Sequence, residues 1–145
     1  MVKIWTRKEY HDKIGYGIMW KDCCPFCNRT ETDIENTIWE GKYWFIIHNI
    51  YPYSWDERHL MAVPFRHINY TYELNDDELL ELNEIFNFMK NYFEWSEYFS
   101  FNRDTMWHRS IEHLHIHYLP WQLKWKYLRK MLEHQWFPIK EDLNL

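Results

Sequence analysis

Several short segments of this 145-residue chain are rich in apolar, β-branched and aromatic residues, and in one long segment the apolar residues recur every three to four positions. Short apolar and aromatic runs of this kind, bounded by turns, predict strands. Five strands are expected, at residues 37–39, 43–48, 59–63, 98–102 and 113–119. The turn at residues 40–42 contains Gly41 and is expected to join the first two as a hairpin.

The long periodic segment, residues 75–93, predicts a helix. Asn75 is a suitable N-cap residue, and Glu78 three positions later completes a capping-box pattern. One apolar stripe of this helix is expected to pack on the sheet as core. Its residues are Leu79, Leu82, Ile85, Phe86, Met89 and Phe93.

A second helix is expected over residues 122–135, where apolar residues again recur at helical spacing. The order of elements predicts an α+β fold, with an antiparallel sheet of about five strands, a long helix packed on it and a C-terminal helix. Only three Gly and five Pro are present and no linker-like segment stands out, so a single domain is expected over residues 1–145.

The composition limits the partners of the chain. Its net charge is −5 and it has no basic stripe, which argues against binding to long nucleic acids but allows a small nucleotide. Ten Trp and eleven Tyr exceed the needs of a small core, so a homodimer surface or a base-stacking pocket is expected; an aromatic-rich core is the alternative. Without a signal-peptide core or an apolar run of membrane-spanning length, a cytoplasmic protein is expected.

Three histidines alternate with apolar residues near the end of the chain: His113, His115 and His117. In a strand they would form a row on one face, with Leu114 and Ile116 buried behind them. Imidazole titrates near neutral pH, so such a row can combine a nucleophile with a group that neutralises phosphate, or it can bind a metal. The spacing alone leaves both readings open.

The residues around this row resemble the histidine triad family of nucleotide hydrolases and transferases. In that family a His-x-His-x-His motif is followed by apolar residues, as at residues 113–120. Residues 45–52 resemble the strand end that presents a ribose-binding group, and residues 59–67 resemble the block of His, apolar strand, Pro and His. Asn102 and Ser110, eight positions apart, also match. The resemblance covers about residues 23–121.

The resemblance implies a reaction at the α-phosphate of nucleoside phosphoramidates, dinucleoside polyphosphates or related conjugates. His115 would attack the phosphorus and form a nucleotidyl-histidine intermediate, while His117 and His59 would flank the phosphate. Ser110 would help the leaving group depart. The nucleotide-binding residues would be Asn49 at the ribose and Asn102 near the phosphate.

Cys24 and Cys27 match the Cys-x-x-Cys pair of the zinc-bearing branch of the family. That branch implies a structural zinc site in which His67 and His113 are the other two ligands. No catalytic metal is expected. The alternative for the two cysteines is that they are small buried hydrophobic residues beside a turn.

The loop at residues 103–109 departs from the family, which has a Gly-rich loop ending in Gly-Gln-Ser. Here no glycine is present, and Arg109 stands in place of the usual Gln. We expect Arg109, with Arg103, to contact a polyphosphate leaving group, because a guanidinium pairs with phosphate through two hydrogen bonds. An exposed charge in a loop is the alternative.

Two other functions remain open from the sequence. One is a non-catalytic, zinc-stabilised nucleotide-binding or interaction module, which the altered loop would permit. The other is a metal-dependent hydrolase whose ligands are the histidines of the row. The family resemblance also implies a homodimer with a continuous sheet.

Overall fold

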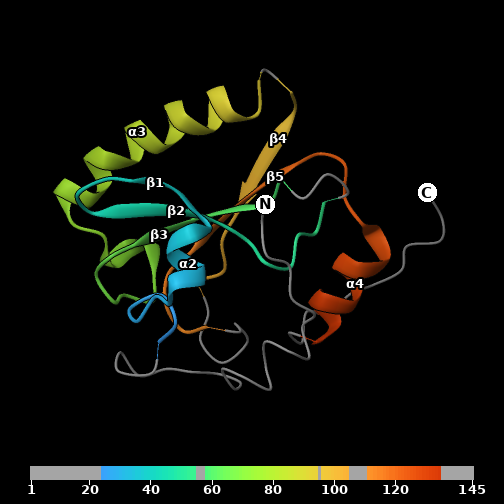
Figure 1. Ribbon diagram of the computed structural model, residues 1–145, viewed down its shortest axis with the longest axis horizontal. Helices are drawn as coiled ribbons and strands as arrows, with labels where there is room; N and C mark the ends of the chain where they lie inside the picture. Colours follow the sequence, from blue (N-terminus) through green and yellow to red (C-terminus); the bar gives the residue numbers. More distant parts are fainter. Residues whose placement is uncertain (1–23, 55–57, 95, 105–110, 135–145) are drawn as a thin grey trace.

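The structure is a computed structural model that describes residues 24–54, 58–94, 96–104 and 111–134. Five strands form one antiparallel sheet in the order β1-β2-β3-β5-β4 (Figure 1). The strands are β1 (Thr37–Glu40), β2 (Trp44–His48), β3 (Leu60–Pro64), β4 (Tyr98–Phe101) and β5 (Ile116–Pro120). The helices are α2 (Glu31–Glu35), the 3-10 turn η2 (Thr71–Glu73), α3 (Asp76–Tyr92) and α4 (Trp125–His134). The predicted α+β architecture is confirmed.

Helix α3 begins with the predicted capping box. The Asn75 side chain accepts the Glu78 N–H at 2.9 Å, and the Glu78 carboxylate accepts the Asn75 N–H at the same distance. Glu78 is buried and pairs with Arg66 at 2.8 Å, and this hydrogen bond lowers the pKa of the carboxyl group. The cap therefore also ties the start of α3 to the segment that follows β3.

The apolar stripe of α3 is narrower than predicted. Ile85, Met89 and Phe93 are fully buried, whereas Leu79 and Phe86 are 47% and 52% exposed. With 3.6 residues per turn, these two side chains lie to one side of the buried row of α3, where the sheet no longer covers the helix. They were wrongly expected in the core.

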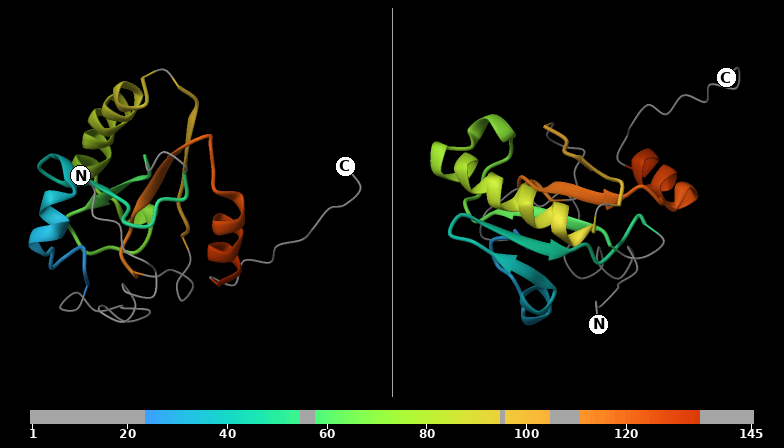
Figure 2. Two further views of the ribbon diagram at one scale, coloured as in Figure 1. Left: turned by 45° about the vertical axis from the view of Figure 1, so that its right-hand side comes forward. Right: turned by 90° about the horizontal axis from the view of Figure 1, so that it is seen from above.

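The two faces of the sheet pack against different partners, because side chains alternate along each strand. On one face α3 covers Trp44, Ile46 and Ala62. On the other face Phe45 and Leu119 pack with Cys24, and Leu128 of α4 packs against this second cluster. Helices α3 and α4 consequently lie on different sides of the sheet (Figure 2).

Two short elements were not predicted. Helix α2 follows a capping box between Thr30 and Asp33, and it contains no buried residue, so it has no apolar stripe to detect. The turn η2 likewise contains no buried residue. Strand β5 also begins three residues later than predicted, so His113 and His115 precede the strand.

No helix in the described part of the chain is both long enough and apolar enough to cross a membrane.

Candidate active site and metal centre

The three alternating histidines divide into two groups where the chain enters β5. His117 is the second residue of β5, and its ring centroid lies 4.9 Å from that of His115. His113 instead faces Cys24, with Sγ and Nδ1 3.4 Å apart. The Leu114 N–H donates to the carbonyl of Ile68 at 2.7 Å, which holds this segment beside the chain that follows β3. The strand expected from residue 113 begins only at Ile116, so His113 and His115 lie before it.

One hydrogen bond determines the tautomer of His115. Its Nδ1 lies 2.7 Å from the carbonyl oxygen of His113. A carbonyl can only accept, so Nδ1 carries the hydrogen and the lone pair of the neutral ring is on Nε2. The half-buried ring is also in contact with Phe26, at a centroid distance of 5.4 Å. His115 thus has a ring held at Nδ1, with the lone pair of its neutral form on Nε2.

A second chain of hydrogen bonds joins His59 and His117. The Tyr53 N–H donates to His59 Nδ1 at 3.2 Å, so the hydrogen of neutral His59 is on Nε2. That atom lies 2.8 Å from His117 Nδ1 and donates to it. By the same reasoning neutral His117 carries its hydrogen on Nε2. The pair therefore presents a ring N–H at its His117 end, as a group that can donate to a phosphate oxygen.

Burial keeps both rings of this pair neutral. It lowers the pKa of His59 to about 3, with the charge of nearby His115 as a smaller cause. The pKa of His117 is also well below its usual value, first because of burial and then because of His115 and His59. A proton added at neutral pH would have no solvent to stabilise its charge.

Asn49 contacts this histidine pair, and Asn102 follows Phe101, which lies opposite His117. Asn49 is buried, its Oδ1 accepts the Tyr51 N–H at 2.8 Å, and its Nδ2 is 3.3 Å from His59 Nε2. This distance is long because both of those nitrogens carry hydrogen. Asn102 comes directly after β4, and its Nδ2 donates to Asp104 at 3.0 Å. Ser110 and Arg109 lie outside the described residues.

The four predicted metal ligands gather on the same side of the sheet. The ligand atoms of Cys24, Cys27, His67 and His113 all lie within 4.8 Å of one another. The two Nδ1 atoms are 3.2 Å apart, and Cys27 Sγ lies 3.2 Å from His67 Nδ1 and 3.5 Å from His113 Nδ1. These four residues can hold a metal ion.

Local structure prepares these groups as ligands. The N–H groups of Cys27 and Asn28 donate to the Cys24 carbonyl, which closes a tight turn and brings the two thiols together. His113 Nε2 donates to the carbonyl of Pro64 at 2.8 Å, so the lone pair is on the Nδ1 that faces the cluster. Burial raises the pKa of the Cys24 thiol to about 12, so a cation is needed to stabilise its thiolate.

Comparison with known proteins decides the family. A family profile described as "Scavenger mRNA decapping enzyme C-term binding", which is a histidine-triad-like domain, matches residues 23–132. The chain belongs to the histidine triad family.

Solved histidine triad structures share the fold. A HIT family hydrolase from Legionella pneumophila is 22% identical with a TM-score of 0.53, and the alignment covers 68% of this chain and 93% of that one. A histidine triad nucleotide-binding protein from Candida albicans is 18% identical, with a TM-score of 0.56 and coverages of 68% and 75%. A diadenosine triphosphate hydrolase from Plasmodium falciparum is 16% identical, with a TM-score of 0.52 and coverages of 71% and 76%. No curated protein sequence matches.

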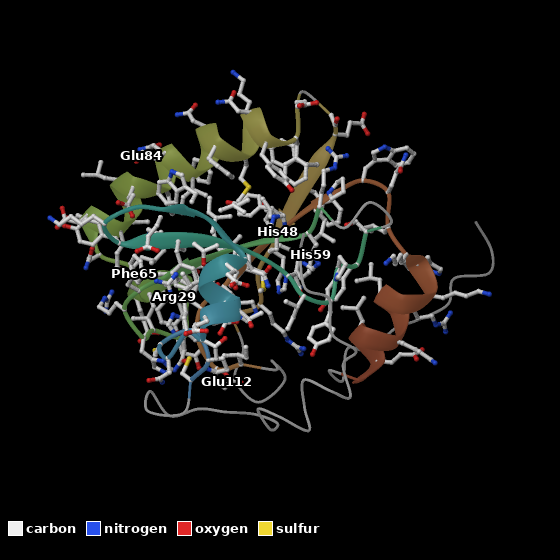
Figure 3. The ribbon with its side chains drawn as sticks, viewed as in Figure 1. Arg29, His48, His59, Phe65, Glu84 and Glu112 are labelled. Carbon is white, nitrogen blue, oxygen red and sulfur yellow. The ribbon has the colours of Figure 1, made fainter. Side chains whose placement is uncertain are left out.

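Two aromatic residues of this histidine triad site were missed in the sequence. Phe101 lies opposite His117 in the β4–β5 register, and their rings stack at 4.6 Å and 11°. Tyr53 contacts His59 at a centroid distance of 4.5 Å and His117 at 6.0 Å. The position of Phe101 directly before Asn102 was a usable signal. For Tyr53 the sequence had no such signal, because a loop residue has no periodic pattern. His59 lies at the end of the sheet nearer α4 (Figure 3).

Proposed function

We propose that this histidine triad protein hydrolyses or transfers nucleotides at the α-phosphate of phosphoramidates, dinucleoside polyphosphates or related conjugates. The observation that carries the proposal is the 2.7 Å hydrogen bond between His115 Nδ1 and the His113 carbonyl. It places the lone pair on Nε2, beside a neutral pair, His59 and His117, that offers a hydrogen-bond donor. A nucleophile and a phosphate-binding donor therefore lie side by side.

In the first step His115 Nε2 attacks the α-phosphorus, a P–N bond forms, and the bond from phosphorus to the leaving group breaks with its electron pair. The leaving group takes up a proton from the solvent, and Ser110 assists its departure. In the second step water or another acceptor attacks the phosphorus and loses a proton to the solvent, and the P–N bond breaks with its electron pair returning to Nε2 of His115. The N–H of His117 stabilises the phosphate oxygens in both steps, and His59 holds the His117 ring in its tautomer.

The proposed nucleotide contacts are those of Asn49 with the ribose and of Asn102 and Arg109 with the phosphate side. The orientation of the Asn49 amide is fixed, because its side-chain oxygen accepts a hydrogen bond from the Tyr51 N–H. Asn102 Nδ2 donates one hydrogen to Asp104 at 3.0 Å, and the second hydrogen of the same amide would donate to the phosphate.

We also propose that the cluster of two cysteines and two histidines binds a structural zinc ion. With Zn–N bonds of about 2.05 Å and Zn–S bonds of about 2.3 Å, a tetrahedron has N–N edges near 3.3 Å and N–S edges near 3.6 Å. The N–N distance of 3.2 Å and three of the four N–S distances, at 3.2 to 3.5 Å, support this geometry. The ion would hold the thiolates and fix the chain on either side of the triad.

Turnover of a substrate panel tests the enzymatic proposal. His115→Ala is expected to lower kcat for a nucleoside phosphoramidate and for a dinucleoside triphosphate by at least about a thousandfold, because the attacking nitrogen is removed. Asn87→Ala, on the exposed side of α3, is the control and should retain the wild-type rate. Comparable turnover by His115→Ala and the wild type would contradict the proposed mechanism.

A further inference from the structure

Helix α4 and the residues before it carry a charge opposite to that of the whole chain. Between Trp121 and His134 there are four basic residues, Lys124, Lys126, Arg129 and Lys130, and one acidic residue, whereas the net charge of the chain is −5. Positions 126, 129 and 130 are three and four apart and therefore share one side of the helix, a short basic stripe that was not recognised in the sequence. We call this side, together with Trp125, the outer face of α4.

The outer face also exposes tryptophan. Trp125 is 61% exposed, and Trp121, which precedes the helix, is 64% exposed. Lys126 and Lys130 are exposed as well, and Arg129 pairs with Glu133 at 3.0 Å. Large exposed indole rings beside ammonium groups match a ligand that combines flat aromatic bases with phosphates.

Helix α4 is attached to the wall of the triad site. The Lys124 N–H donates to the Tyr53 carbonyl at 2.7 Å, and Leu123 forms a β-bridge with Ser54. The Tyr53 ring in turn contacts His59 and His117. One backbone hydrogen bond therefore links the first residue before α4 to the residue that borders the proposed catalytic histidines.

The apolar side of α4 is packed against the core of the domain. Leu128 and Leu123 pack on the core cluster that contains Tyr53, on the face of the sheet opposite α3. An amphipathic helix that binds membranes needs this side free to enter the lipid. The packing leaves only the basic and aromatic side for a ligand, which argues for a soluble anion.

We propose that the outer face of α4 binds the leaving nucleotide of a dinucleoside polyphosphate. Its lysines contact the distal phosphates, and Trp125 stacks on the second base, while the first nucleotide occupies the triad site. This inference rests on the proposed function. A nucleotide site on α4 favours substrates with two nucleotides over phosphoramidates with a small amine.

Equilibrium binding to the full chain tests the proposal without relying on turnover. The probes are a methylene-bridged diadenosine triphosphate and AMP, titrated calorimetrically. In Lys126→Gln/Lys130→Gln, and separately in Trp125→Ala, the Kd of the bridged probe is expected to rise at least fivefold while that of AMP changes less than twofold. The lysine variant should also show a weaker dependence of Kd on salt. Lys90→Gln on α3 is the matched control and should change neither value.

Two results would overturn this inference. One is a Kd for the bridged probe that stays within twofold of the wild type in both variants. The other is an equal rise for AMP, which would mean general damage to the triad site. Neither result bears on the catalytic role of His115, and loss of that role would leave the binding difference in place.

Discussion

Three histidines of one motif, two positions apart, have three different surroundings. His113 turns its Nδ1 towards two thiols, because its Nε2 donates to Pro64. His115 directs its Nδ1 to the carbonyl of His113, and His117 accepts from His59. Identical side chains thus acquire different chemistry from the partner of a single ring nitrogen.

At this scale the sequence predicted which residues meet, but not how they are oriented. The cluster of Cys24, Cys27, His67 and His113 was expected from the family motif, and the structure brings all four together. The ring contacts of Phe101 and Tyr53 with His117 were not foreseen, because they depend on strand register and on a loop whose path leaves no pattern in the sequence.

The buried His59 makes stability depend on pH. Its pKa is about 3 in the folded protein and near 6.5 in the unfolded chain, so the unfolded state binds more protons between these values. Stability from neutral His59 is therefore complete above about pH 6.5 and falls as the pH drops towards 3. The free energy of unfolding, measured with urea at pH 7 and pH 5, should fall less in His59→Gln than in the wild type. The difference between the two proteins should be up to about 1.4 kcal/mol per pH unit.

Asn87→Ala, at an exposed position on α3, is the control for this comparison and should keep the pH dependence of the wild type. If His59→Gln and the wild type lose the same unfolding free energy between pH 7 and pH 5, the account of a neutral, buried His59 is wrong.

Among the elements, the long helix was the most predictable and the shortest were the least. Asn75 and Glu78 signal the start of α3 through their reciprocal hydrogen bonds, which depend on local sequence alone. The start of β5 was misplaced because alternation continues through His113 and His115, although their backbone is shaped by contacts with Pro64 and Ile68. Such contacts between distant segments cannot be read from periodicity.

The proposed zinc site joins three segments: the Cys turn, the chain after β3 and the chain before β5. Purified protein is therefore expected to contain about one zinc per chain by elemental analysis, and Cys27→Ser should lose most of it. Removing the metal with a chelator should lower Tm by about 10 °C or more, because the free energy of metal binding to the folded chain adds to its stability.

Glu84→Ala is a suitable control for the metal, since Glu84 projects from α3 away from the sheet (Figure 3). It should keep the wild-type zinc content and Tm. A protein that contains no zinc, and whose Tm does not respond to the chelator, would contradict the proposed site.

In the whole molecule, the sheet has α3 on one face and the candidate site on the other. Helix α3 and its core cluster cover one face, while the candidate site residues His59, His113 and His117, the cysteines and α4 gather on the other. This division follows from strand alternation, so the α+β fold could be predicted from the sequence. The placement of α4 beside the site could not, because it depends on the bridge between Leu123 and Ser54.

The homodimer and the cytoplasmic location remain predictions. Strand β4 is an edge of the described sheet, with exposed Tyr98 and Phe99. An edge strand with aromatic side chains is a suitable surface for pairing with a second copy.

Trapping the covalent intermediate is the sharpest test of the proposed role of His115. The protein is mixed rapidly with a nucleoside phosphoramidate or a dinucleoside triphosphate, quenched within the first turnover at alkaline pH, where a P–N bond survives, and measured by intact mass. We expect a mass increase of one nucleoside monophosphoryl group in the wild type, located on His115, and none in His115→Ala. Product formation by the wild type without such an adduct, or an adduct that persists in His115→Ala, would contradict this role.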